Sequence, residues 1–197
     1  MKRIAAACAI VFLAAADARA QADIGIQAVG LVSVQPVDDS WVGMPYLNEG
    51  LGGIGPGFGA GINAVLPNRL TISAEFTMAW FSQLQEGRLV SGSTVGVTKD
   101  NTLHDALLGG LIGYSQRDGN TEVRYLIGGA TLLSDRSKAG APVVLNGGVD
   151  FLQAFSRRTS LIVTARYAYV PRNDDGTSLA AGPHVVRVGA GVRIRLR

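Results

Sequence analysis

Cysteine and long apolar runs are nearly missing from this chain of 197 residues. The single cysteine, Cys8, lies within the first twenty residues, so the sequence beyond them has no thiol for a disulfide, a nucleophile or a metal ligand. No continuous run of about 18 apolar residues follows either, which excludes helices that cross a membrane. The candidates are therefore folds that need neither thiols nor membrane helices.

A strong excess of one charge sign is also missing beyond residue 20. The whole sequence has 18 basic and 15 acidic residues. Four of them, Lys2, Arg3, Asp17 and Arg19, fall in the first twenty, which leaves 15 basic and 14 acidic residues and a charge of about +1. Nucleic-acid-binding proteins carry a basic face, so nucleic acid is not expected as a partner.

The first twenty residues have the features of a secretory signal peptide. Lys2 and Arg3 are followed by an apolar segment at 4–16 and by small residues at positions 18 and 20, with Arg19 between them. Because Cys8 lies inside the apolar segment, lipid attachment to it is not expected. We predict a signal peptide over residues 1–20 and one domain over residues 21–197, exported from the cytoplasm.

Alternation with a period of two dominates the remaining sequence. In the stretch 186–196, Val, Ala, Ile and Leu alternate with Arg and Gly, and in 70–80 apolar residues alternate with Thr, Ser and Glu. Successive side chains of a strand point to opposite faces, so this pattern indicates β-strands. Eight such stretches are predicted, six clear and two with apolar residues on both faces, at 22–34, 58–66, 70–80, 102–114, 121–132, 143–155, 159–169 and 186–196.

The connections between these stretches alternate between long and short. The short ones are 67–69, 116–120 and 156–158, and the long ones are 35–55, 83–101, 134–142 and 171–183. Strands of about 9 to 11 residues can cross a bilayer when tilted. The sequence therefore predicts an all-β fold, an eight-stranded antiparallel up-and-down transmembrane β-barrel.

Glycine shares one face of the strands with the charged residues. Gly128, Gly148, Gly189 and Gly191 have the same parity as arginines or acids of their strands, and Gly59 and Gly61 have the same parity as Asn63. Glycine is costly in a strand, but it leaves room for long side chains inside a narrow barrel. We expect the polar face to point inward and the apolar face outward to lipid. The alternative is a soluble periplasmic barrel, lipocalin-like, with its apolar face inward and a ligand inside.

A network of charged side chains is predicted in the lumen. Its members are Glu75, Glu122, Arg124, Asp150, Arg166, Arg187 and Arg193. Buried charges are costly unless they pair, so both signs must meet there. Such a network could form a gate or narrow ion path, or it could plug the lumen. Eight strands favour the plug, because water-filled channels normally need about 16 strands.

With its leader, eight strands, alternating connections and terminal strand at 186–196, the chain resembles the small eight-stranded outer-membrane barrels, such as the OmpA transmembrane domain, OmpX and the opacity-type surface proteins. The resemblance covers residues 21–197. It implies a location in the bacterial outer membrane, contact with membrane lipid and lipopolysaccharide, and insertion by the barrel-assembly machinery. Arg197 stands where these proteins usually end in an aromatic residue.

The function expected from this resemblance is structural or carried by the long connections, and no enzyme or cofactor is expected. Trp41 and Tyr46 in the first long connection could contact an extracellular ligand, but the absence of a recognisable binding motif favours the simpler interpretation that they only cover the mouth of the barrel. A lipid-modifying outer-membrane enzyme is the alternative, and it would need His104 or His184, for instance with Ser178. These histidines start opposite strands of an eight-membered ring and cannot share one site. The adjacent acids at 174 and 175 are expected to be solvated and not to hold a cation.

Overall fold

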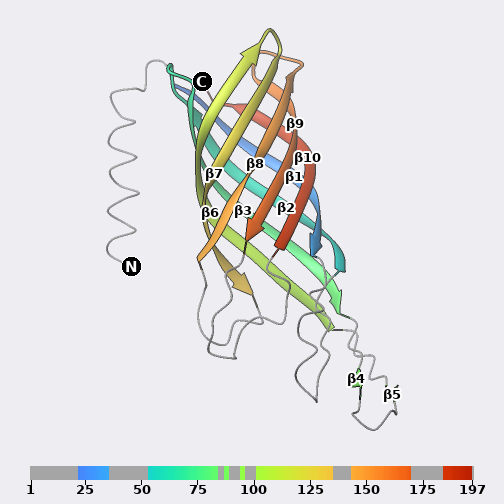
Figure 1. The fold of residues 1–197 in the computed structure, drawn as a ribbon. Helices are drawn as coiled ribbons and strands as arrows, with labels where there is room; N and C mark the ends of the chain where they lie inside the picture. The colour runs from blue at the N-terminus through green and yellow to red at the C-terminus, as the bar shows by residue number, and fades with distance from the viewer. Residues whose placement is uncertain are drawn as a thin grey trace.

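Eight long strands form a closed antiparallel barrel in the computed structural model, which describes residues 22–35, 53–83, 87–88, 94–95, 101–134, 143–169 and 184–196 (Figure 1). The barrel strands are β1 (Asp23–Gln35), β2 (Gly53–Val65), β3 (Leu70–Gln83), β6 (Asn101–Asp118), β7 (Thr121–Ser134), β8 (Val143–Ala154), β9 (Thr159–Tyr169) and β10 (His184–Arg195). Two short strands, β4 (Gly87–Arg88) and β5 (Thr94–Val95), form a separate two-stranded sheet. The prediction of an eight-stranded antiparallel up-and-down barrel is confirmed. The predicted signal peptide lies outside the described residues.

The barrel closes because the first strand pairs with the last. Neighbours along the chain pair all the way round, and β1 then pairs with β10 from Gly25 opposite Arg195 to Val34 opposite Val186. Each of the eight strands thus has a partner on both sides, and the barrel exposes no unpaired strand edge. None of the described residues forms a helix that is long and apolar enough to span a membrane.

All three short turns lie at one end of the barrel, together with the start of β1 and the finish of β10; we call it the hairpin end, and it is at the top of Figure 1. The opposite end, where β1 finishes and β2 begins, is the loop end. Arg69 and Gly119 adopt positive φ values of 68° and 55° in the first two turns, which allows the chain to reverse tightly. The strands run obliquely between the two ends.

Two predicted strands were too short by four residues or more. β6 continues to Asp118, so only Gly119 and Asn120 form the turn that was predicted over 116–120. The extra residues are polar and carry no alternation, but they pair with the start of β7, as Arg117 does with Glu122. β2 begins at Gly53 instead of residue 58, because the ladder with β1 extends through Pro56, opposite Val32, and beyond. Pairing with a neighbour, not local pattern, decides these boundaries.

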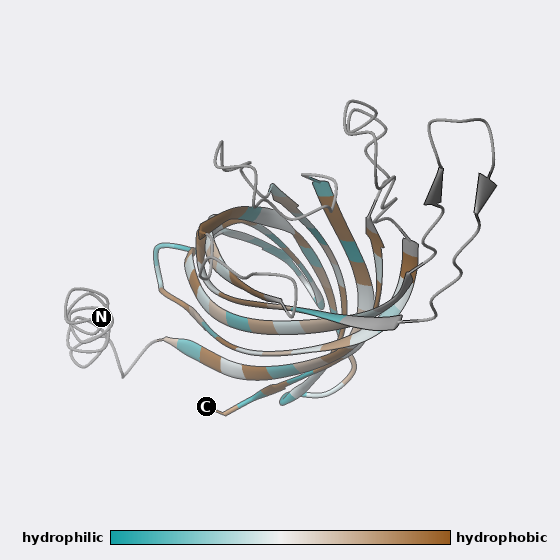
Figure 2. Cartoon of the chain, turned by 90° about the horizontal axis from the view of Figure 1, so that it is seen from below, coloured by the Kyte–Doolittle hydropathy of each residue, from teal (hydrophilic) through white to brown (hydrophobic). Residues whose placement is uncertain are grey.

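The outer face of the barrel is apolar. Among the described residues, twenty-six large hydrophobic side chains are exposed, among them Ile127 at 69% and Leu145 at 66%. Twenty-four of them lie on seven of the eight barrel strands, and Phe155 and Leu196 follow the last residues of β8 and β10. Figure 2 shows the resulting alternation of hydrophobic and hydrophilic residues along each strand. Soluble monomers rarely expose continuous apolar surface on this scale.

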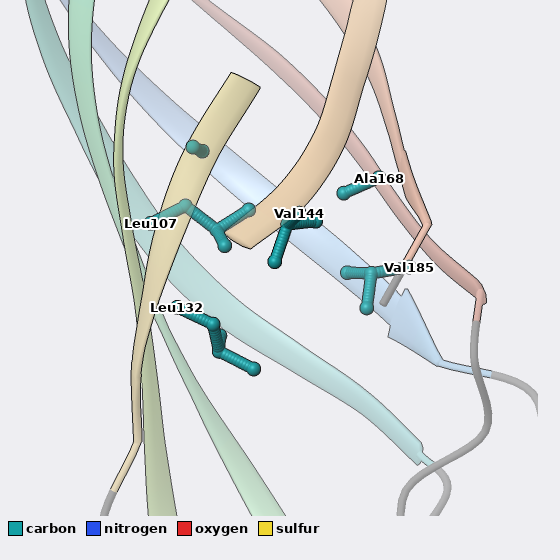
Figure 3. Close-up of a cluster of buried hydrophobic side chains, with 6 residues drawn as sticks. Leu107, Leu132, Val144, Ala168 and Val185 are labelled. Carbon is teal, nitrogen blue, oxygen red and sulfur yellow. The ribbon is translucent and has the colours of Figure 1, made fainter. Parts of the chain in front are cut away.

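Inside the barrel, an apolar cluster lies toward the loop end. It is made of Leu107, Ala130, Leu132, Val144, Ala168 and Val185, all at most 5% exposed. These side chains come from the five consecutive strands β6 to β10, and Figure 3 shows them gathered between the strands. Alternation along the strands did not predict this cluster, because polar residues were expected on the inward faces. Most of the charged lumen residues lie between it and the hairpin end, but Asp105 lies beyond Leu107 toward the loop end.

Candidate functional site in the barrel lumen

The structure places all seven charged residues of the predicted network inside the barrel. They come from β3, β7, β8, β9 and β10, and each is at most 7% exposed: Glu75, Glu122, Arg124, Asp150, Arg166, Arg187 and Arg193. Each of them occupies a strand position whose side chain points into the barrel, because successive side chains of a strand alternate and its neighbours point outward or away. Their contacts fall into three groups at different depths, and hydrogen bonds from Arg193 through Asn63 and Gln27 to Glu75 link two of these groups.

The central group joins three strands through Arg166. Its Nε and Nη2 donate to the two carboxylate oxygens of Glu75 at 3.0 and 2.8 Å, a bidentate arrangement. Nη2 also forms an ion pair with Asp150 Oδ1 at 2.7 Å, although the angle between the two groups is not that of a hydrogen bond. Gln27 and Ser73 donate to Glu75 as well, at 3.3 and 3.1 Å. One guanidinium therefore holds two acids that would otherwise repel each other.

The second group lies nearer the hairpin end and contains Arg124 and Arg193. Arg124 Nε donates to Glu122 Oε1 at 2.6 Å, and Ser115 Oγ donates to the same oxygen at 2.8 Å. Arg193 donates to Asn63 Oδ1 at 2.8 Å through Nε. The Nη1 and Nη2 atoms of Arg124 are buried and have no hydrogen-bond partner among the described residues. Arg124 thus keeps unused donors in the interior of the barrel.

Arg193 shares its acid with the last residue of β10. Its Nη2 donates to Asp23 Oδ1 at 3.0 Å, while Arg195 donates to Oδ1 from Nε at 2.8 Å and pairs with Oδ2 from Nη2 at 2.6 Å. Asp23 and Arg195 are 22% and 28% exposed at the side chain, because they lie at the mouth of the lumen. One carboxylate thus serves two arginines.

The third group surrounds Arg187, nearer the loop end. Arg187 donates to the hydroxyl and the backbone carbonyl of Thr77, and to the backbone carbonyl of Asp105 at 3.2 Å. Asp105 is itself 4% exposed. This arginine is held mainly by oxygens that carry no full charge, unlike Arg166.

Three charged lumen residues were missed by the sequence analysis: Asp23, Asp105 and Arg195. With them, the described lumen holds five arginines and five acids and is electrically neutral. Arg195 was detectable, because it has the same parity as Arg187 and Arg193. Asp23 was not, since it stands at the start of a stretch with apolar residues on both faces.

Little free space remains between these groups. Two cavities of about 10 and 20 Å³ lie beside Arg166 and Arg187, bounded by Glu75 and Thr77. A cavity of this size has room for about one water molecule. Such waters would satisfy nearby buried atoms that have no hydrogen-bond partner among the described residues, such as Asn146 Oδ1 and Arg187 Nε.

The room that the inward glycines were expected to leave for arginines is not found at the six glycines named from the sequence, but it is found at another glycine. At Gly25, a Cβ would lie 2.6 Å from the guanidinium of Arg193, so glycine does leave room for an arginine. At Gly128, Gly148 and Gly191, a Cβ would instead meet backbone of the neighbouring strand. There glycine permits the close approach of strands in a tightly curved barrel.

The two histidines lie on strands that are opposite in the ring. Three strands separate β6, which carries His104, from β10, which carries His184, whichever way round the barrel is followed. His104 packs against Trp80, and His184 Nδ1 lies 2.5 Å from the hydroxyl of exposed Tyr167. No group of three or more potential metal ligands occurs among the described residues. Ser178, the acids at 174 and 175, and the first long connection with Trp41 lie outside the described residues.

Comparison with solved structures identifies several barrels of the same fold. OprG, an outer membrane protein of Pseudomonas aeruginosa, aligns with a TM-score of 0.56 over 90% of this chain and 97% of its own, at 11% identity. Ail, the attachment invasion locus protein of Yersinia pestis, aligns with a TM-score of 0.51 over 89% and 99%, at 12% identity. Neisserial surface protein A aligns with a TM-score of 0.50 over 89% and 99%, at 14% identity. At this level of identity the likeness concerns the fold.

No protein-family model matches the chain, and comparison with curated proteins also finds no match.

Proposed function

We propose that the protein is a bacterial outer-membrane barrel with a closed lumen, and that its role is structural or carried by its long connections. The observation that supports this best is the inverted polarity of the fold. Large apolar side chains cover the outside while five arginines and five acids are held inside. A hydrocarbon environment stabilises this arrangement, and water would not. Membrane lipid and lipopolysaccharide are then the partners of the outer face, and the barrel-assembly machinery would insert it.

The contents of the lumen support a plug and not a pore. The charges neutralise one another in the lumen, the apolar cluster from Leu107 to Val185 fills the side toward the loop end, and the two cavities beside Arg166 are water-sized. A solute or hydrated ion could pass only if the ion pairs of the central group separated. Separation would leave carboxylates and guanidinium buried and unpaired, at a high cost in free energy.

A role for the long connections is supported by analogy with the fold neighbours. The Ail structure was solved in complex with a heparin analogue, and Neisserial surface protein A is described as a surface protein. We therefore propose that the long connections of this chain face the cell exterior and contact a ligand there, while the barrel holds them in place.

Catalysis is not supported, since the two histidines are far apart in the ring and both contact aromatic rings. The soluble carrier is not supported either, because the barrel holds its charged residues inside and, within the part of the chain that the structure describes, the cavities beside Arg166 and Arg187 have room for only about one water molecule each.

The test combines location with conductance. The protein should be found in the outer-membrane fraction and should migrate faster on gels before boiling than after it, because folded membrane barrels resist detergent until heated. In planar bilayers, the refolded protein should give no steady channel current. Recovery of the protein from the soluble periplasmic fraction, with no shift on boiling, would refute the membrane location. Regular single-channel steps would refute the plug and leave the location intact.

A further inference from the structure

A cavity of about 430 Å³ opens at the hairpin end of the barrel, and it is far larger than the water-sized cavities deeper inside. Its lining includes four arginines and no acid: Arg117, Arg157, Arg158 and Arg195. We call this cavity the arginine vestibule. Arg117 comes from the end of β6, Arg157 and Arg158 from the turn between β8 and β9, and Arg195 from the end of β10.

Backbone hydrogen bonds hold the three parts of the vestibule together. The amide of Ala154 donates to the carbonyl of Asn120 at 2.8 Å, which joins the turn after β6 to the end of β8. The amide of Arg195 donates to the carbonyl of Arg158 at 2.7 Å, which joins the turn after β8 to β10. Four cationic residues from distant parts of the chain are therefore kept close together by the closed barrel, without a ligand.

The turn that carries two of the arginines is also fixed. Ser156 Oγ accepts hydrogen bonds from the amides of Arg158 and Thr159 at 3.2 and 3.0 Å, a local motif that stabilises tight turns. Because this hydroxyl accepts in both contacts, its own proton remains available to a ligand. Pre-ordering of this kind reduces the entropy cost of binding.

The arginines of the vestibule have spare donors. Arg157 and Arg158 form no ion pair within the described residues, and Arg117 donates only a long bond of 3.4 Å to the carbonyl of Gly119. Arg195 uses Nε and Nη2 on Asp23, which leaves Nη1 outside that pair. Four guanidinium groups around one cavity repel each other unless an anion lies between them.

The charges just below the vestibule do not offset this excess. Arg124 and Arg193 lie deeper along β7 and β10, and together with Arg195 they face only two acids, Asp23 and Glu122. Arg124 is fully buried and has two terminal nitrogens without hydrogen-bond partners among the described residues. These three arginines and two acids therefore carry one uncompensated positive charge, next to the other three arginines of the vestibule.

We infer that the arginine vestibule binds a phosphate-bearing anion, of the size of a diphosphate or of a lipid phosphate headgroup. Guanidinium forks match the oxygens of phosphate in pairs, and several forks favour a ligand with more oxygens and charge than one carboxylate. If the protein lies in the outer membrane as proposed, this ligand reaches the barrel from the periplasmic side, opposite the long connections. The site is thus separate from any surface contact of those connections.

The experiment uses the full-length barrel, refolded in neutral maltoside micelles at low salt, with inorganic pyrophosphate as the probe in a calorimetric titration. The test variants are Arg158→Gln and Arg157→Gln. The matched control is Arg69→Gln, which removes an arginine from another turn at the same end. Arg69 does not line the vestibule and donates to Tyr114 at 3.2 Å. All three changes alter the net charge equally.

We expect one pyrophosphate per barrel, bound about tenfold more weakly by Arg158→Gln and Arg157→Gln than by the natural protein, and within about twofold of it by Arg69→Gln. Equal weakening in all three variants would overturn the inference, since it would indicate a diffuse positive field and no site. Absence of binding up to about 5 mM pyrophosphate would overturn it as well.

A second arm separates the two sources of phosphate. Phosphatidylglycerol is added to the micelles during the titration. If it weakens pyrophosphate binding to the natural protein, the vestibule accepts a lipid headgroup; if it has no effect, the vestibule takes a soluble phosphate. Both results support the site. Because the barrel is folded in micelles, this experiment succeeds or fails independently of where the protein resides in the cell.

Discussion

Replacement of Arg166 by methionine should destabilise the barrel strongly. Arg166 is 6% exposed and holds Glu75 at 2.8 and 3.0 Å and Asp150 at 2.7 Å. Methionine fills much of the space but leaves the two carboxylates, themselves 7% and 1% exposed, without their cation. Loss of one partner of a buried ion pair typically costs about 3–5 kcal/mol, because the remaining charge stays buried.

The measurement is urea unfolding of the refolded barrel. At each urea concentration, a gel gives the fraction of the protein that still migrates as the folded barrel. With a urea dependence of about 2 kcal/mol per molar, a loss of 3–5 kcal/mol lowers the midpoint by about 1.5–2.5 M. The matched control is Arg157→Met, which removes an exposed arginine from a turn and should shift the unfolding free energy by less than about 0.5 kcal/mol.

A triple variant tests the reason for the loss. Glu75→Gln and Asp150→Asn, added to Arg166→Met, remove both orphaned charges and should restore most of the stability. Equal stability of Arg166→Met and Arg157→Met would refute the claim that the central ion pairs hold the lumen together. A triple variant less stable than Arg166→Met would refute the assignment of the cost to unpaired charge.

Two further predictions test the packing and the polarity of the strands. Gly25→Ala places a Cβ 2.6 Å from the guanidinium of Arg193 and should lower the free energy of unfolding by about 1–3 kcal/mol in the same urea assay. In the control Gly30→Ala, the Cβ meets nothing closer than 4.0 Å and should lower it by less than about 0.5 kcal/mol. Equal losses would contradict the assignment of Gly25 to arginine packing. Ile127→Arg changes a residue on the outer face in the middle of β7 and should lower the free energy of unfolding in lipid vesicles by about 2–4 kcal/mol. Val143→Arg changes the first residue of β8, at the loop end, and should lower it by no more than about 1 kcal/mol. If both arginines are tolerated equally, the outer face does not lie in a bilayer.

Local pattern was enough to predict the eight strands and the inward face of seven of the ten charged lumen residues. Alternation is a property of neighbouring residues along the chain, so the inward positions of Glu75, Arg166 and Arg187 can be read without knowing which strands pair. The same pattern failed where the signal is weak: at the polar end of β6, at the Gly- and Pro-containing start of β2, and at the inward apolar residues such as Leu132.

Apart from Glu122 and Arg124, which are neighbours on one face of β7, which charges meet was decided by the tertiary structure. Arg166 and Glu75 are 91 positions apart, and they meet across the lumen only because the barrel closes in one register at one diameter. Closure also brings Arg117, Arg158 and Arg195 to one vestibule, although nothing in their local sequences relates them. Alternation determines the side of a strand on which a residue lies, while its depth and its partners depend on strand register, which no local pattern encodes.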